Sequence, residues 1–357
     1  MIESTLANLQ ASTAGTVGGP DLIKEIINAT RDCVLIVDPD LRVSHLNAAA
    51  VRAFSRPGLE IGRRRLTEAI RDLDLHGAFR KAILAGEASE VRLEIIGTER
   101  RRFNVHVAPL DLEGVRHGIG FFYDTTQVER LEAVRQEFLS NISHELRTPL
   151  TSILAFVETL EDGAFEDPDN NRRFLATIRR NAERMNSLIA DILELSLIES
   201  GKVSIAPRNV RFRELTEEVF TNLSAKARDR EINLINLVGP GTMPFADPGR
   251  LEQMIINLVD NAIKFNRRGG TVSVDCERLE DRSLITVSDT GEGILPEHME
   301  RLFERFYRID RARSREIGGT GLGLAIVKHL ARLHGGEVSV RSALSEGTTF
   351  TIELPGE

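Results

Sequence analysis

The sequence predicts a multidomain α+β protein, because three hydrophobic patterns follow one another along its 357 residues. In the first third, apolar residues alternate with polar ones, which is typical of strands. They then recur every three or four residues over two long stretches, which is typical of amphipathic helices. The last third mixes both patterns. Since 41% of the residues are hydrophobic and 28% are charged, we expect packed domains rather than disorder.

The whole-chain properties exclude several classes of protein. A net charge of −8 argues against a general nucleic-acid binder. The two cysteines, Cys33 and Cys276, lie too far apart for a metal motif or a disulfide framework, which fits a reducing compartment. No stretch approaches ~18 consecutive apolar residues, and the N-terminus lacks the pattern of a secretory signal. We therefore expect a cytoplasmic protein with no membrane span in this chain, or a membrane-associated one if the sequence is a truncated form.

The first domain is predicted to follow a flexible lead-in. Residues 1–21 are rich in Ala, Thr, Ser and Gly. Residues 22–125 then read as a small α+β domain with an antiparallel sheet. Its opening stretch, "CVLIVDPDLRVSHLN", holds an apolar run, a turn and a second alternating run. The alternation returns in "EVRLEII", "RRFNVHVAPL" and "RHGIGFFYDTT", with shorter helical stretches between them.

Two long helices are predicted within residues 126–203. The first starts near Gln127, and the second runs from about Arg172 to Glu199. Each carries an apolar stripe with helical spacing, at Leu131, Val134, Phe138, Ile142, Leu146, Leu150, Ile153, Val157 and Leu160, and at Phe174, Ile178, Met185, Leu188, Ile192 and Leu195. Two antiparallel helices cannot bury such stripes alone, whereas two copies can pair into a four-helix bundle. We therefore expect a homodimer.

The last domain, residues 204–357, is predicted to be an α/β sandwich with one helical layer over a mixed sheet. Strand patterns lie in "VSIAPRNVRF" and "EINLINLV" and in two hairpins, "GTVSVDCERLEDRSLITVSDTG" and "GEVSVRSALSEGTTFTIELP". Helical patterns cover residues 214–227 and 251–265 and the stretch "GLGLAIVKHLARLHGG".

One helix of this last domain carries a candidate metal and phosphate site. The stretch "NLVDNAIKF" places Asn257, Asn261 and Lys264 on one helical face. An asparagine oxygen suits Mg²⁺, which also binds substrate phosphates and keeps several waters. The ammonium group of Lys264 can meet phosphate charge. An asparagine pair on a helix is more often plain surface, so the motif gains weight only beside the next two.

Two glycine-rich stretches follow. In "SDTGEGI", Asp289 ends a strand and precedes Gly291 and Gly293, so a fixed carboxylate can accept from an amine while a ligand approaches the backbone. Alone, this pattern is more often a turn. The stretch "GGTGLGLA" opens a helix, where backbone N–H groups form a phosphate nest; its glycines are Gly318, Gly319, Gly321 and Gly323.

These motifs, in this order, resemble those of two-component sensor histidine kinases. "FLSNISHELRTPLTSI" is similar to the phosphoacceptor box, "NLVDNAIKF" to the asparagine box, "LFERFYRID" to the phenylalanine box, and "VSDTGEGI" and "GGTGLGLAIVKHL" to the two glycine boxes. The resemblance covers residues 127–355. Residues 22–125 resemble a PAS sensor domain, and the nearest subgroup is the phosphate-regulon sensor kinases. The implied folds are a PAS-like α+β domain, a dimeric four-helix-bundle phosphoacceptor domain and an ATP-binding domain of the Hsp90 and histidine kinase type.

The resemblance implies a role for the helix around His144. His144 would be the phosphoacceptor, since neutral imidazole is a nucleophile at physiological pH. Glu145 would accept a hydrogen bond from the other ring nitrogen and stabilise the cation formed on attack. Thr148 lies four residues after His144, on the same face. It would orient a water that attacks the phosphorylated regulator.

The resemblance also implies how ATP and Mg²⁺ bind. Asn261 would hold Mg²⁺, with Asn257 and Lys264 on the phosphates, and Asp289 would accept from the adenine amino group. Phe265 would lie against adenine, where the family often has tyrosine. A lid over residues 295–317 would carry Tyr307 and Arg308, the latter steadying charge on the transferred phosphoryl group. The basic lid residues Arg311, Arg313 and Arg315 fit a solvated loop equally well. The remaining family positions are Gly291, Gly293, Gly319, Gly321 and Gly323.

The implied function is a sensor histidine kinase that phosphorylates itself on His144 from Mg-ATP. It would pass the phosphoryl group to an aspartate of a response regulator and would also act as a regulator phosphatase. Two other functions compete with this one. A hydrolytic ATPase of the Hsp90 and mismatch-repair type carries a water-activating glutamate four residues before the metal asparagine, where this chain has Asn257. A catalytically dead scaffold would lack a glycine box or the phosphoacceptor, and this sequence retains all of them.

Overall fold

The computed structural model describes residues 25–54, 64–96, 100–162, 168–310 and 319–356. The chain divides into two compact units, Met1–Glu137 and Phe138–Glu357. The predicted lead-in at residues 1–21, the lid residues Arg311, Arg313 and Arg315, and Gly318 of the second glycine-rich stretch lie outside the described residues. Within the described part, no helix has the length and hydropathy needed to cross a bilayer.

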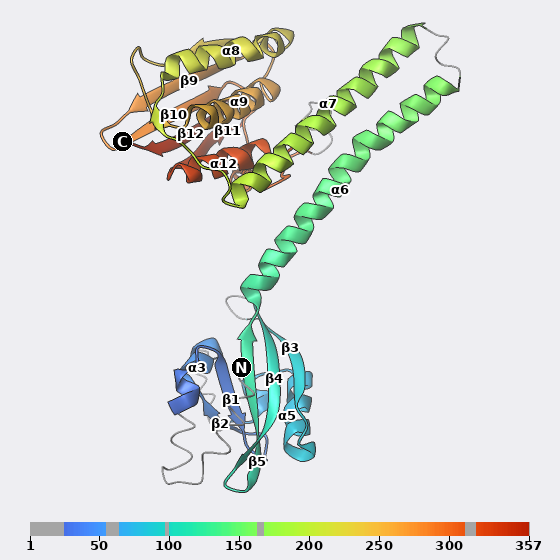
Figure 1. Ribbon diagram of the computed structural model, residues 1–357, viewed down its shortest axis with the longest axis vertical. Coiled ribbons are helices and arrows are strands. Elements are labelled where there is room, and N and C mark those ends of the chain that lie inside the picture. The colour runs from blue at the N-terminus through green and yellow to red at the C-terminus, as the bar shows by residue number, and fades with distance from the viewer. Residues whose placement is uncertain (1–24, 55–63, 97–99, 163–167, 311–318, 357) are drawn as a thin grey trace. The chain divides into compact units, whose positions relative to one another are not determined.

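The first unit is built on an antiparallel five-stranded sheet, as the alternation predicts, with the strand order β2-β1-β5-β4-β3. The strands are β1 (Cys33–Val37), β2 (Val43–Leu46), β3 (Ser89–Ile96), β4 (Arg100–Leu112) and β5 (Val115–Asp124). Short helices complete the unit, namely α3 (Ala48–Phe54), α4 (Leu66–Ala69) and α5 (Leu73–Ala85). Figure 1 shows α5 lying beside the long strands β4 and β5.

Aromatic rings fill the core of this unit. Phe54, Phe103 and Phe122 pack against one another at ring-centroid distances of 5.0–6.3 Å. The ring of Phe79 on α5 lies so close to β5 that a Cβ added to Gly118 or Gly120 would meet it at 2.7 Å. The two glycines of "GIG" therefore let the helix approach the sheet.

The two predicted helices are present as α6 (Thr126–Glu161) and α7 (Pro168–Glu199). α6 continues through Pro149 as one helix. In the second unit these helices keep large apolar side chains exposed, at Leu139, Leu150, Leu154, Leu175, Ile189, Leu193 and Leu197. Only Leu150 among these seven residues belongs to the predicted stripes, so most of the apolar side chains that a single chain leaves exposed on the two helices lie outside the stripes.

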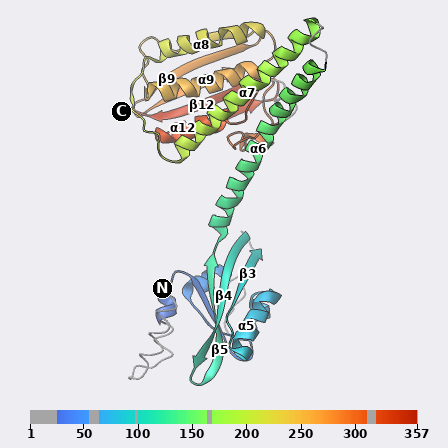
Figure 2. The same ribbon diagram turned by 45° about the vertical axis from the view of Figure 1, so that its right-hand side comes forward.

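The rest of the second unit is the predicted sandwich. Its mixed sheet has the order β11-β12-β10-β9-β7, in which only β7 pairs in parallel. The strands are β7 (Asn233–Asn236), β9 (Thr271–Arg278), β10 (Arg282–Asp289), β11 (Glu337–Ala343) and β12 (Gly347–Pro355). One layer of helices covers it, as Figures 1 and 2 show, formed by α8 (Phe212–Asp229), α9 (Pro248–Lys264) and α12 (Gly323–Leu333).

The strand predicted over "VSIAPRNVRF" is wrong for most of its length. Only β6 (Arg208–Asn209) pairs, with β8 (Phe245–Ala246). Pro207 cannot donate to a sheet ladder. Val210 and Phe212 are buried, but Phe212 already begins α8. Their apolar character reflects burial in the core and not membership of a strand.

Candidate active site

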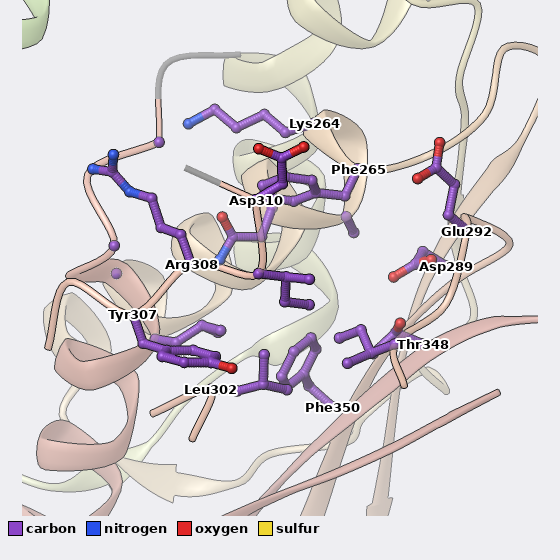
Figure 3. A pocket seen from close by; sticks show the side chains of 18 of the residues that line it. Lys264, Phe265, Asp289, Glu292, Leu302, Tyr307, Arg308, Asp310, Thr348 and Phe350 are labelled. Carbon is purple, nitrogen blue, oxygen red and sulfur yellow. The ribbon is translucent and has the colours of Figure 1, made fainter. Parts of the chain in front are cut away.

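A cavity lies where the end of α9, the end of β10, the start of α12 and the segment after α10 (Pro296–Met299) meet (Figure 3). Its predicted lining residues are Asn261, Lys264, Phe265, Asp289, Gly293, Tyr307, Arg308, Gly319, Gly321 and Gly323. The sequence motifs, which are up to 62 residues apart along the chain from Asn261 to Gly323, therefore meet at one place. This convergence makes the cavity the candidate active site.

The helix α9 carries the asparagine motif because its start and its buried face are both well defined. Asp247 caps it by accepting from the backbone N–H of Arg250 at 3.1 Å, and Pro248 occupies the first turn. Leu251, Leu258 and their apolar neighbours are fully buried. Burial of that face turns the last turn of the helix toward the cavity.

The three polar residues of α9 have different surroundings. Asn261 lines the cavity, whereas Asn257 does not and instead lies against Gly323, whose added Cβ would meet Asn257 Oδ1 at 3.3 Å. Lys264 lines the cavity but is ion-paired with Asp260. The same carboxylate accepts from Lys226 at 2.7 Å. Burial opposes ionisation of Asp260, but the two ammonium groups outweigh it and lower the pKa of this carboxyl group. Lys264 is therefore held by a carboxylate that sequence reasoning missed.

Asp289 ends β10 at the other side of the cavity. Its register partner on β12 is Thr348. Burial raises the pKa of the Asp289 carboxyl group, although the backbone N–H groups of Gly291 and Thr348 partly offset this. The Gly291 bond is 2.8 Å long. Gly291 thus steadies Asp289 without lining the cavity itself, while Asp289 keeps acceptor capacity for a ligand.

Two of the predicted glycines are required by packing. Gly293 has φ 72°, and a Cβ there would lie 2.0 Å from the carbonyl oxygen of Ala343. Gly321 has φ 76°, and its Cβ would lie 2.9 Å from Phe306 Cα. Both positions therefore need glycine for backbone conformation and for close packing, in addition to any approach by a ligand.

The segment after α10 brings Tyr307 and Arg308 to the cavity. The Tyr307 hydroxyl lies 2.8 Å from His298 Nδ1, and the Arg301 guanidinium stacks 4.4 Å from the centroid of the Tyr307 ring. Phe265 also lines the cavity and is 42% exposed, which leaves its ring available to a planar ligand.

The phosphoacceptor candidate lies on α6. His144 is exposed, as is Thr148, whose hydroxyl donates to the His144 carbonyl oxygen at 3.1 Å. Glu145 Oε2 accepts from Arg184 and from Arg308, each at 3.1 Å. Arg308 therefore links the cavity to the residue beside His144. The predicted bond between Glu145 and the His144 ring stays a prediction, since the carboxylate is engaged by two arginines here.

Sequence reasoning missed several lining residues, namely Ala262, Glu292, Ile294, Leu302, Ile309, Asp310, Thr320, Leu324, Thr348 and Phe350. Most lie within or beside the recognised motifs. Thr348 and Phe350 come from the final hairpin instead, and Figure 3 shows Thr348 beside Asp289. The alternation in "GTTFTIEL" places both on the same face of a strand and was the available signal.

Three known domain families match the chain in the predicted order. Residues 27–130 match the PAS fold, residues 134–201 match the His Kinase A (phospho-acceptor) domain, and residues 246–357 match the "Histidine kinase-, DNA gyrase B-, and HSP90-like ATPase" family. Together these matches place a PAS-fold domain before a phospho-acceptor domain and an ATPase-like domain.

Two sensor proteins are similar to this chain in sequence. The sensor histidine kinase WalK of Bacillus subtilis is 38% identical over 243 residues, which is 66% of this chain and 39% of WalK. The sensor protein SrrB of Staphylococcus aureus is 33% identical over 232 residues, which is 65% of this chain and 40% of SrrB. The chain thus spans about two fifths of the length of these curated relatives.

Solved structures have the same fold. The histidine kinase AdeS of Acinetobacter baumannii has a TM-score of 0.50 at 25% identity, over 60% of this chain and 98% of that one. The histidine kinase ThkA, in complex with the response regulator protein TrrA, has a TM-score of 0.51 at 22% identity, over 93% and 98%. At that identity ThkA bears on the fold alone.

The chain therefore has the domain composition of a PAS-containing two-component sensor kinase. The predicted family and the predicted fold class are thereby confirmed. The resemblance to the phosphate-regulon subgroup stays a prediction.

Proposed function

We propose that this protein is an ATP-dependent histidine kinase that phosphorylates itself on His144 and passes the phosphoryl group to an aspartate of a response regulator. One observation carries the proposal. Arg308 lines the candidate nucleotide cavity and also donates to Glu145, the neighbour of the exposed His144. A group that touches both places can steady charge on a phosphoryl group moving between them.

The cavity offers matched partners for ATP. Asp289 would accept from the adenine amino group while Phe265 packs on the ring. The backbone at Gly319, Gly321 and Gly323 would meet the phosphates at the start of α12. Lys264, steadied by Asp260, would present its positive charge to the same groups. Asn257 does not line the cavity, and it would act through Gly323, the first residue of α12, against which it lies.

Mg²⁺ fits the polar end of this cavity. Asn261 offers one amide oxygen there, and Mg²⁺ typically takes few protein ligands together with phosphates and water. When bound, the ion would neutralise charge on the phosphates. The protein's own part is to hold the nucleotide, to present His144 and to place Arg308.

His144 would attack phosphorus through a neutral ring nitrogen, so no proton has to leave that nitrogen first. Glu145 would turn from its arginine partners to the other ring nitrogen and stabilise the imidazolium that forms. The receiver aspartate of a response regulator would then take the phosphoryl group. The cytoplasmic location predicted from the sequence remains a prediction beside this proposal, as do the domain boundaries at residues 22–125, 126–203 and 204–357.

The test is the chemistry of the label left by ATP labelled at the γ-phosphate. A histidine kinase gives a protein-bound label that is lost in acid and kept in base, because a phosphoramidate bond hydrolyses on protonation. A hydrolytic ATPase would give free phosphate and no bound label, and an inactive scaffold would give neither. Transfer of the label to a receiver domain would complete the proposed reaction.

A homodimer is the second part of the proposal. The apolar side chains exposed on α6 and α7 include Leu150, Leu154 and Leu193, and each such side chain is worth ~1.5–3 kcal/mol when buried. We expect a fragment spanning residues 127–203 to sediment as a dimer. Replacing Leu150 and Leu154 with Lys should convert the fragment to a monomer. Replacing the exposed Arg179 and Arg180 with Lys should leave it a dimer. A well-folded monomer of the unchanged fragment would refute the four-helix arrangement.

Phosphatase activity would depend on Thr148. Its hydroxyl hydrogen is donated to the His144 carbonyl oxygen, so the lone pairs of Oγ1 can accept from a water. The aspartyl phosphate is already reactive, and positioning a water is then sufficient catalysis.

Thr148→Ala should leave the His144 label near normal, while phosphorylated regulator should persist about tenfold longer or more with the variant and ADP. Thr148→Ser, which keeps the hydroxyl, should behave like the unchanged protein. Equal regulator lifetimes with all three proteins would remove Thr148 from this role.

A further inference from the structure

The hydroxyl of Ser342 is a hydrogen-bonding node directly behind the candidate nucleotide cavity. Ser342 lies near the end of β11, and its register partner on β12 is Thr348. Its Oγ lies 2.8 Å from the Gly347 carbonyl oxygen and 2.9 Å from Thr348 Oγ1. The backbone N–H of Ile294 donates to it at 2.9 Å. Thr348 and Ile294 both line the cavity.

The three bonds assign the hydrogens. A serine hydroxyl has one hydrogen to donate and two lone pairs that accept. The Gly347 carbonyl can only accept, so the Ser342 hydrogen belongs to that bond. The Ile294 N–H can only donate and fills one lone pair. The second lone pair is left for Thr348, which must therefore donate its own hydroxyl hydrogen to Ser342.

This arrangement of hydrogens determines whether Thr348 can donate a hydrogen bond to a ligand or only accept one. With its hydrogen committed to Ser342, the Thr348 oxygen has only lone pairs left for the cavity. Its neighbour Asp289, when ionised, is also an acceptor only. Because Thr348 is only 6% exposed, bulk water has little access to its hydroxyl oxygen and competes little with a ligand for hydrogen bonds to it. This edge of the cavity consequently presents two adjacent acceptors, which suits an amino group and disfavours a carbonyl oxygen.

The same node also holds the chain that carries the glycine motif. Ile294 is tied to Ser342, and the backbone N–H of Ser345 donates to the Glu292 carbonyl oxygen at 2.8 Å. The end of β11 and the turn that follows it thereby hold the segment on both sides of Gly293. Loss of the Ser342 hydroxyl would leave the Ile294 N–H unpaired and would free Thr348 to rotate its hydrogen toward the cavity.

We propose that Ser342 is a positioning residue that holds Thr348 as a hydrogen-bond acceptor, and thereby strengthens the preference of this site for a purine with a 6-amino group over one with a 6-oxo group. The inference rests on the proposed function, which places the purine against Asp289. It adds a residue that does not line the cavity and acts only through its neighbours.

The test compares ATP and GTP binding to the full chain. Ser342→Ala should weaken ATP binding roughly five- to tenfold, the effect of one lost hydrogen bond, and should weaken GTP binding less or not at all. The dissociation constant for GTP divided by that for ATP should therefore fall. Ser342→Thr, which keeps the hydroxyl, should retain most of the ratio. Ser339→Ala, an exposed serine on the same strand, is the matched control and should leave both constants unchanged.

A double-mutant comparison separates positioning from a general structural effect. In a Thr348→Val background there is no hydroxyl to orient, so adding Ser342→Ala should not further change the ratio of the GTP to the ATP dissociation constant. An equal loss for ATP and GTP, or a change of ratio that persists beside Thr348→Val, would overturn the inference. If the unchanged protein binds neither nucleotide, the proposed function itself fails. If it prefers ATP and Ser342→Ala keeps that preference in full, only the role of Ser342 fails.

Discussion

His144→Ala is expected to abolish the acid-labile protein label while leaving ATP affinity unchanged. His144 is exposed on α6 and does not line the cavity, so its side chain makes no contribution to holding the nucleotide. Without the imidazole there is no acceptor for the phosphoryl group. The label should fall at least about a hundredfold, to background, since a lost nucleophile is not replaced by its neighbours.

The matched control for this loss is His76→Ala. His76 is a partly buried histidine on α5 in the first unit, and its replacement should leave the label intact. Affinity is measured in parallel with a fluorescent ATP analogue, so that an unfolded variant is not mistaken for an inactive one. A label that survives His144→Ala would contradict the assignment of the phosphoacceptor.

Asp289→Asn should weaken ATP binding by about 10- to 100-fold, the range expected for a hydrogen bond to a charged group. The carboxylate only accepts, whereas the amide presents N–H donors that would oppose the adenine amino group. Asp281→Asn makes the same change at an aspartate whose side chain is 80% exposed, and it should have no effect. An affinity equal to that of the unchanged protein would remove Asp289 from the site.

The pH dependence of binding has a definite sign. Burial raises the pKa of Asp289 above its ordinary value, so the carboxyl group begins to take up a proton at a higher pH than an exposed aspartate does. ATP affinity should therefore fall as the pH is lowered through this raised pKa, and Asp289→Asn should lose that dependence. The stability of the protein without ATP depends on pH in the opposite direction. The raised pKa of Asp289 stabilises the folded state at pH values below the pKa of this group in the unfolded chain. This stabilisation is lost as the pH rises through the pKa of the group in the folded protein.

The sequence alone could predict the parts of the site that depend on local spacing. Asn261 and Lys264 follow from helical periodicity and Asp289 from the end of a strand, and the structure brings all three to one cavity. Partners from distant elements could not be predicted in this way. Asp260 precedes Lys264 by one helical turn, but Lys226, which shares the same carboxylate, lies 34 residues before Asp260, and no local pattern links these two residues.

Strand pairing limited the prediction in a different manner. Thr348 becomes a neighbour of Asp289 only because β10 and β12 pair in one particular register. A shift of one residue would send its side chain to the other face. The same limit explains the long strand wrongly expected around Pro207, where buried residues suggest a strand but only Arg208–Asn209 pairs. Periodicity reports which residues are buried, but the partners of a sheet edge are decided by the whole fold.

The close contact of Phe79 with Gly118 and Gly120 bears on how genetic screens of this protein would be interpreted. Any side chain at either glycine would overlap the ring, and overpacking of this kind typically costs ~1–3 kcal/mol. Missense alleles that silence signalling should thus gather on β5 even if nothing binds there. Such alleles would lower the amount of folded protein and would not change a binding site. Measuring protein levels beside each phenotype would separate them from mutations that alter signalling directly.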